Sequence, residues 1–202
     1  MGMGTRAGKV GKSLLIVLGV ILLGVVALNF GYWKDQVRYL LNTGDAPSLP
    51  VTADVRYMEP DTIVIEKFNL TTPVIYVDEA TEEAFQDAMS RGVGHYPGTA
   101  KIGEYGNAYV FGHSSRAPWN NSDYNTIFSL IPRLEIGDIV LASDSEGRVY
   151  NYRVVRKFVV DPNDTTVLNQ YDRKTRMLTL QTSWPLGMTL RRYIVVTEVL
   201  DQ

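Results

Sequence analysis

The 202-residue chain is long enough for one ordinary domain and a small appendage, and its 45% hydrophobic and 21% charged residues are typical of a globular protein. The net charge of −2 comes without a dense Lys/Arg run beyond the amino terminus, which excludes a nucleic-acid-binding footprint. There is no cysteine, so disulfides, zinc thiolate sites and thiol catalysis are excluded for this sequence.

An uncharged apolar stretch follows the basic amino terminus. As a helix, residues 13–33 match the roughly 30 Å apolar core of a bilayer. A cleaved signal peptide is the alternative, but residues 27–29 precede large aromatic residues and make a poor cleavage site. The positive-inside rule places the basic residues in the cytoplasm. We expect a cytoplasmic tail at 1–12, a single transmembrane anchor at 13–33 and an extracytoplasmic remainder.

Turn-forming residues mark 34–52 as a juxtamembrane linker that leads to a domain at 53–202. Within this domain, short β-branched stretches alternate with turn residues and predict strands at 62–65, 74–77, 107–112, 138–142, 148–160, 176–182 and 192–200. A helix is expected at 79–91, with Thr81 as its amino-terminal cap and Gly92 as its stop, and a shorter helix at 124–130. So many short strands indicate a closed barrel or a sandwich.

Four polar residues stand at the ends of predicted strands. His113 follows an apolar strand, Ser183 precedes Trp184 and a proline that stops its strand, and Arg191 and Arg192 open the last strand. Taken alone, each has an ordinary explanation as a surface histidine, a turn serine or a solvated rim. The sequence contains no metal-loop spacing, no phosphate-binding glycine loop and no Gly-x-Ser-x-Gly elbow.

Taken together, these pieces resemble the sortase family of membrane-anchored cysteine transpeptidases. Residues 94–100 (GHYPGTA) and the stretch from Gly106 to His113 resemble the segment that ends on the family's catalytic histidine. Residues 179–183 (TLQTS) resemble the Thr-Leu-x-Thr-Cys strand that carries the nucleophile, and Arg192 resembles the last-strand arginine. The first of these segments is most similar to the class D and class E sortases.

The resemblance implies a mainly β, eight-stranded closed barrel with one or two short helices behind the transmembrane helix. It implies cleavage of a Leu-Pro-x-Thr-Gly-like signal on surface proteins and transfer of the acyl group to an amine from peptidoglycan or a pilin, without a metal or an organic cofactor. His113 is expected to protonate the leaving amine, and Arg192 to donate to the substrate carbonyl or oxyanion. His95, Thr182 and Trp184 are expected as substrate contacts.

Ser183 stands where the resemblance predicts the nucleophilic cysteine. A thiol with a pKa of about 8.5 supplies some thiolate near neutrality, whereas a serine needs a true general base, which serine hydrolases orient with a third residue. Asp123 is the nearest downstream carboxylate for that role. Three explanations stay open: an engineered Cys→Ser change, a natural inactive relative that binds sorting peptides as an adaptor, and a natural serine-using enzyme. We expect weak activity or none from the sequence as given.

Overall fold

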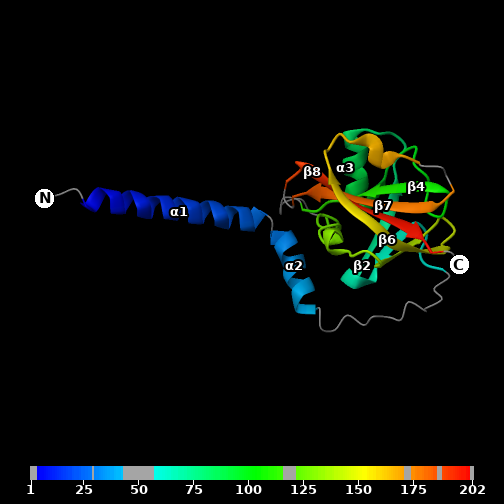
Figure 1. The fold of residues 1–202 in the computed structure, drawn as a ribbon, viewed down its shortest axis with the longest axis horizontal. Coiled ribbons are helices and arrows are strands. Elements are labelled where there is room, and N and C mark those ends of the chain that lie inside the picture. The colour runs from blue at the N-terminus through cyan, green and yellow to red at the C-terminus, as the bar shows by residue number, and fades with distance from the viewer. Residues whose placement is uncertain are drawn as a thin grey trace.

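The body of the molecule is a closed barrel of eight strands, in the order β1-β2-β3-β4-β7-β8-β6-β5 (Figure 1). The computed structural model describes residues 4–28, 30–42, 57–115, 122–170, 174–185 and 188–200. The β2–β3 and β4–β7 pairs are parallel, and the other neighbouring pairs are antiparallel. The predicted mainly β, eight-stranded closed barrel is confirmed.

The strands follow the predicted stretches closely, with one short addition. They are β1 (Thr62–Ile65), β2 (Leu70–Tyr76), β3 (Val93–His95), β4 (Gly106–Phe111), β5 (Ile139–Ser143), β6 (Val149–Val160), β7 (Arg176–Trp184) and β8 (Arg191–Val199). Three short 3-10 helices, η1 (Glu66–Phe68), η2 (Ile131–Arg133) and η3 (Thr165–Leu168), lie between strands. β3 was not predicted, because Gly92 before it and Gly94 within it interrupt the β pattern.

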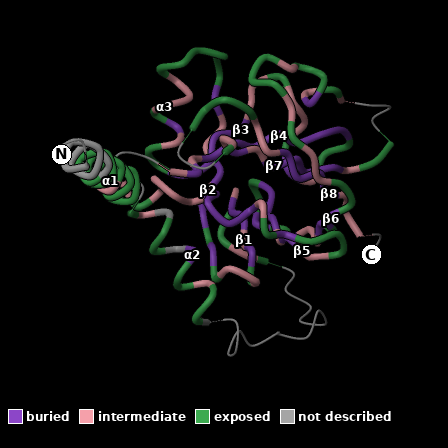
Figure 2. Tube along the Cα trace, turned by 60° about the vertical axis from the view of Figure 1, so that its left-hand side comes forward, coloured by how far each residue is buried: buried purple, intermediate pink, exposed green. Residues whose placement is uncertain are grey.

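Two hydrophobic clusters lie on opposite faces of the sheet. The barrel interior is filled by fully buried side chains such as Val110, Leu178 and Leu180, and Figure 2 shows the buried backbone concentrated in the strands. A second cluster, which includes Tyr109 and Ile194, covers the outer face of β4, β7 and β8. Because successive side chains in a strand alternate between faces, these clusters identify the face on which every residue of β7 lies.

The helix α3 (Glu82–Arg91) lies outside the barrel against β2 and β3. Thr81 caps it as predicted, since its hydroxyl accepts a hydrogen bond from Ala84 N at 3.3 Å. The ring of Phe85 packs against Phe111 of β4, with centroids 4.9 Å apart. The helix therefore anchors an aromatic contact beside the outer end of β4.

The helix predicted at 124–130 is wrong. This stretch forms successive turns with i to i+3 bonds, among them Ile127 N to Tyr124 O at 3.2 Å and Ser129 N to Thr126 O at 2.9 Å. The amide of Phe128 instead donates to His113 O at 2.9 Å, which withdraws it from any helical ladder. We call residues 122–134 the plug segment, because its side chains Phe128, Ile131 and Leu134 are fully buried in the core.

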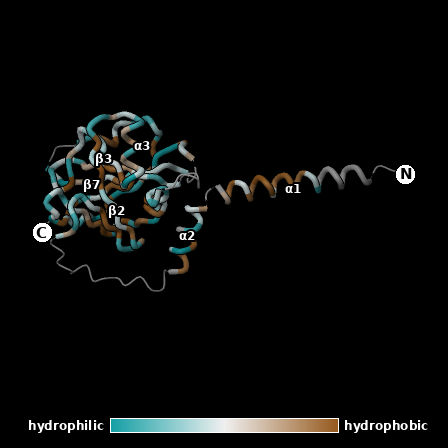
Figure 3. The backbone as a smooth tube through the Cα atoms, turned by 180° about the vertical axis from the view of Figure 1, so that it is seen from behind, coloured by the Kyte–Doolittle hydropathy of each residue, from teal (hydrophilic) through white to brown (hydrophobic). Residues whose placement is uncertain are grey.

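Two helices precede the barrel: α1 (Gly4–Leu28), which extends away from it, and α2 (Phe30–Asn42), which lies beside it (Figure 1). The apolar middle of α1 is brown in Figure 3, and its large side chains from Leu14 to Val26 are exposed. No helix in the part of the chain that the structure describes combines the length and apolar character needed to cross a membrane. α2 occupies the first part of the predicted linker 34–52, whose later residues lie outside the described ranges.

Candidate active site

The ends of β4, β7 and β8 bring three polar residues into one row. The antiparallel register of β7 and β8 pairs Ser183 directly with Arg192. The parallel register of β4 and β7 pairs Phe111 with Gln181, so two residues further along the same register His113 comes beside Ser183. The three residues of the predicted catalytic set therefore fall at one level across three neighbouring strands.

Hydrogen bonds keep the chain aligned with β7 beyond the end of β4. Gly112 N donates to Gln181 O at 3.1 Å, and the Thr182 hydroxyl donates to Gly112 O at 3.0 Å. A Cβ on Gly112 would lie 2.8 Å from the ring of Phe128, so only glycine fits between β7 and the plug segment. The backbone that leads into His113 is thus held from both sides.

The row lies on the outer face of the barrel. Leu178 and Leu180 point into the interior, so Gln181 and Ser183 alternate to the outside. Arg192 shares the face of Ile194, which belongs to the outer cluster. The side chains of His113, Ser183 and Arg192 are all partly exposed, unlike the buried residues below them. This position leaves the row accessible to a polypeptide that approaches from outside.

The register distinguishes the two neighbouring arginines. Arg192 is opposite Ser183, whereas Arg191 is opposite Trp184 and so lies on the other face. The Arg192 Nη1 donates to Thr189 O at 3.1 Å and to Arg191 O at 3.2 Å, which ties the guanidinium to the turn before β8. The exposed Arg191 forms a 3.7 Å ion pair with Asp161. Arg192 is therefore the arginine placed to act beside Ser183.

A tyrosine and a glutamine next to this row were not anticipated from the sequence. Tyr109 OH donates to Gln181 Oε1 at 2.5 Å, and Gln181 lies two residues before Ser183 on the same face. Burial raises the pKa of Tyr109, against the opposing effect of the Arg192 charge, so the phenol stays a hydrogen-bond donor. This bond fixes the orientation of the Gln181 amide. The only indication in the sequence was that Gln181 is a polar residue in the predicted strand 176–182, two positions before Ser183.

Thr182 and Trp184, which were expected as substrate contacts, lie on the face opposite to Ser183. Thr182 is buried, and its hydroxyl is engaged with Gly112 O. The indole of Trp184 packs on Tyr193, with ring centroids 5.2 Å apart. Their geometry favours a structural role, in which they hold the two strands that carry the row.

His95, the third expected substrate contact, is buried on the inner face of β3. It pairs with Val110, whose side chain is in the barrel core. His95 Nε2 donates to Ala100 O at 2.8 Å and lies 3.1 Å from the Thr99 hydroxyl. Burial lowers the pKa of His95, and the bond to Ala100 opposes that shift. His95 thus supports the loop of residues 96–100 from the inside, away from the row.

The row has the chemical groups needed for acyl transfer on a peptide. An imidazole can move a proton at the leaving amine, and a guanidinium can donate hydrogen bonds to a carbonyl that gains negative charge. The hydroxyl of Ser183 is the weakest of the three parts, because it needs a base to become a nucleophile. Asp123, the carboxylate considered for orienting His113, is exposed at the start of the plug segment. Among the described residues, no group of three or more His, Asp or Glu could hold a metal ion.

Comparison with known proteins identifies the family and the fold. The family model described as "Sortase domain" matches residues 63–200. Sortase D of Bacillus subtilis (strain 168) is 28% identical over 134 residues, which cover 65% of this chain. The match spans 59% of the length of that curated relative.

Solved structures agree with the observed barrel. A Clostridium perfringens Sortase D5 transpeptidase is 28% identical, with a TM-score of 0.56 over 69% of this chain and 78% of that one. Sortase A from Corynebacterium diphtheriae is 22% identical, with a TM-score of 0.59 over 72% of this chain and 62% of that one. At this lower identity, the second likeness shows the fold alone.

Proposed function

Because this chain belongs to the sortase family, we propose that its outer face is built to cleave a Leu-Pro-x-Thr-Gly-like sorting signal and to transfer the acyl group to an amine. The observation that supports this most strongly is the row of His113, Ser183 and Arg192 across β4, β7 and β8. Its substrates would be surface proteins that bear the signal. The acceptor amine would come from peptidoglycan or from a pilin.

With a cysteine at position 183, the proposed reaction begins when its thiolate attacks the carbonyl carbon of the threonine. A carbon–sulfur bond forms, the peptide carbon–nitrogen bond breaks, and His113 gives a proton to the departing amine. Arg192 donates hydrogen bonds to the oxyanion while negative charge is on it. The acceptor amine then attacks the thioester carbon and gives a proton to the now neutral His113. A carbon–nitrogen bond forms, and the carbon–sulfur bond breaks to regenerate the thiolate. Each step conserves atoms and charge without a metal or an organic cofactor.

Ser183 changes the expected rate of this reaction. Its hydroxyl is far less acidic than a thiol, and the neighbouring arginine stabilises an anion without abstracting a proton. We therefore propose that this sequence is a weak or inactive form of the transpeptidase. An engineered Cys→Ser change or a natural inactive relative would give such a form, whereas a natural serine-using enzyme would turn over peptide with Ser183 in place.

The second candidate function is a non-catalytic adaptor that binds sorting peptides. It is favoured by one observation, the oxygen of Ser183 in place of a sulfur, because peptide binding does not require a nucleophile. The two functions differ in what a cysteine at this position would do.

The first prediction compares peptide turnover and peptide affinity in the full chain and in its Ser183→Cys variant. If the chain is a transpeptidase scaffold, the Ser183→Cys variant should cleave a Leu-Pro-x-Thr-Gly-type peptide and join it to an added amine. The chain with Ser183 should bind the same peptide with little turnover. Adding His113→Ala should abolish the reaction, and adding Arg192→Lys should lower kcat by about 10²-fold, since the bidentate donor is lost.

The controls decide between the two functions. Arg191→Lys is the matched control for Arg192, because Arg191 lies on the other face. Binding in both forms with no turnover in Ser183→Cys would support the adaptor and refute the enzyme. Turnover that survives His113→Ala would show that the reaction does not use this row.

We also propose that residues 13–33 attach the chain to the cytoplasmic membrane, with the amino terminus inside and the barrel outside. The proposed segment runs from α1 into α2 across residue 29, so it is longer than the apolar part of either helix taken alone. The basic residues before it and the exposed apolar side chains of α1 support this attachment.

A further inference from the structure

The side chain of Gln36 in α2 is buried against the plug segment, residues 122–134. Its exposed fraction is 4%, although most of α2 faces solvent. Its Nε2 donates to Ser129 O at 3.4 Å, and its Oε1 accepts from Arg133 Nε at 2.5 Å. A buried amide with both ends satisfied by one short segment fixes the position of that segment relative to the helix.

Two further contacts join the same face of α2 to the barrel. The guanidinium of Arg133 lies over the ring of Tyr39 at 5.4 Å, and Tyr39 meets Phe68 edge to face at 5.5 Å. A Cβ on Gly31 would lie 3.1 Å from Cγ2 of Thr126, so the start of α2 is also close to the plug segment. The helix therefore touches the segment at three separate points along its length.

The plug segment in turn holds the main chain of His113. Phe128 N donates to His113 O at 2.9 Å, and the Phe128 ring fills the space beside Gly112. Phe128 is fully buried and is next to Ser129, the residue that Gln36 contacts. The contact to His113 and the contact to α2 are thus made by two consecutive residues, Phe128 and Ser129.

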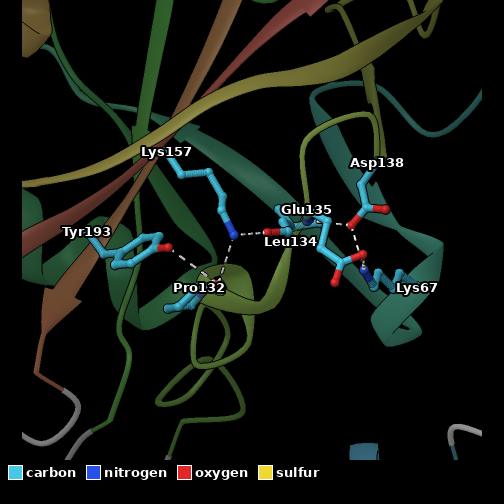
Figure 4. Close-up of polar contacts among 7 residues, drawn as sticks. All are labelled: Lys67, Pro132, Leu134, Glu135, Asp138, Lys157 and Tyr193. Atoms are coloured by element: carbon cyan, nitrogen blue, oxygen red, sulfur yellow. Dashed lines mark hydrogen bonds and ion pairs between the residues drawn. The ribbon is translucent and has the colours of Figure 1, made fainter.

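The other end of the plug segment is fastened to β6 and β8, as Figure 4 shows. Lys157 Nζ donates to Leu134 O and to Pro132 O, and Tyr193 OH donates to Pro132 O at 3.5 Å. Just beyond the plug segment, Lys67 bridges Asp138 at 2.7 Å and Glu135 at 3.5 Å. With this end fixed to the barrel, and with the Ser122 hydroxyl at the start of the segment donating to Ser90 O of α3 at 2.8 Å, α2 restrains the part of the segment next to Phe128.

We propose that α2 is a clamp on the plug segment, and that Gln36 and Arg133 are positioning residues that set the place of His113 in the row. The role in turnover rests on the proposed transpeptidase function, whereas the clamp itself does not. Because misplacement of a catalytic group by about 1 Å can cost about 10²-fold in rate, loss of the clamp lowers kcat more than it raises KM. Helix α2 thereby contributes to the geometry of the row through the plug segment.

The test uses the full chain with Gln36→Leu, which keeps the size of the side chain and removes both hydrogen bonds. Hydrogen exchange at the Phe128 amide should become at least about tenfold faster, because its bond to His113 O opens more often. The ring resonances of His113 should shift. In the Ser183→Cys background, kcat should fall about tenfold while KM stays within about twofold. Gln36→Glu, which still accepts from Arg133 but can no longer donate to Ser129 O, should give a rate between those of Gln36 and Gln36→Leu.

Val37→Ala is the matched control, since Val37 is the next residue on α2 and is half exposed, and it should change none of these readings. Unchanged Phe128 exchange in Gln36→Leu would overturn the clamp. Faster exchange with unchanged His113 resonances or unchanged kcat would overturn the positioning role. If Ser183→Cys shows no turnover at all, the proposed function fails separately, and the exchange and resonance measurements still decide the clamp and the placement of His113.

Discussion

His95 is a buried histidine surrounded by charges of both signs. Burial lowers its pKa, Lys101 adds to that effect, and the bond to Ala100 together with Glu104 and Asp61 opposes it. Because a carbonyl can only accept, the bond to Ala100 O requires a proton on Nε2. The neutral imidazole, protonated on Nε2, therefore makes this hydrogen bond. Adding a second proton would place a positive charge in a buried position.

The second prediction is a pH dependence of stability that arises from His95. Its pKa is lower in the folded state than the unfolded value of about 6.5, so the unfolded chain binds the proton first as pH falls. This contribution to stability is complete above about pH 6.5 and is lost progressively below it. In urea unfolding between about pH 7.5 and about pH 5, the free energy of unfolding should fall more steeply with decreasing pH for the chain with His95 than for His95→Gln. Equal slopes in the two proteins would contradict this origin.

The catalytic candidates could be predicted from the sequence, but their shared face could not. His113, Ser183 and Arg192 were recognisable because each ends or begins an apolar strand within a family-like motif. The choice between Arg191 and Arg192 depends on the register of β8, which a one-residue slip would reverse. The partnership of Tyr109 with Gln181 joins residues 72 positions apart, and no local pattern reports such a pair.

At the scale of elements, the strand β3 depends on the absence of a side chain at Gly94. Gly94 is opposite Phe111, and the ring of Phe111 lies across it. A Cβ at Gly94 would be 2.4 Å from the nearest ring atom. Phe85 of α3 packs on the far side of that ring, so the ring has little room to move away.

The third prediction is that Gly94→Ala destabilises the barrel and that Phe111→Leu partly restores it. Overpacking of this kind costs about 1–3 kcal/mol, and a smaller side chain at 111 removes the collision. Denaturant unfolding of the two single variants and the double variant measures the coupling between the sites. Thr71→Ala, at an exposed position of β2, is the control. Additive effects of Gly94→Ala and Phe111→Leu would show that the ring contact is not the cause.

Elements with strong local signals were predicted well, and elements made by tertiary contacts were not. Thr81 predicts the start of α3 because its capping bond to Ala84 joins residues only three positions apart. The turns at 124–130 looked helical because the competing acceptor, His113 O, is distant in sequence. The sequence predicts only a linker at 34–52, because the position of α2 depends on the bond from Gln36 to Ser129, 93 positions away.

At the scale of the whole molecule, the barrel buries its apolar side chains, whereas α1 exposes them. Closure pairs the backbone of all eight strands and leaves no free sheet edge. In α1, by contrast, the large apolar side chains from Leu14 to Val26 are exposed. A continuous apolar surface of this kind is uncommon on soluble monomers, and it supports the proposed attachment of residues 13–33 to a membrane. Basic residues at one end and a folded barrel at the other suit a lipid bilayer.

The fourth prediction follows from this asymmetry. The full chain should float with neutral lipid vesicles and stay with them after an alkaline, high-salt wash, since apolar burial is insensitive to charge screening. Leu18→Arg with Leu22→Arg should abolish flotation, because each charge costs about 2.5–3.5 kcal/mol at the centre of a membrane helix. Val37→Arg on α2, beyond the proposed segment, should still float. A chain with a folded barrel that stays in the aqueous phase, or a double arginine variant that still floats, would contradict attachment through 13–33.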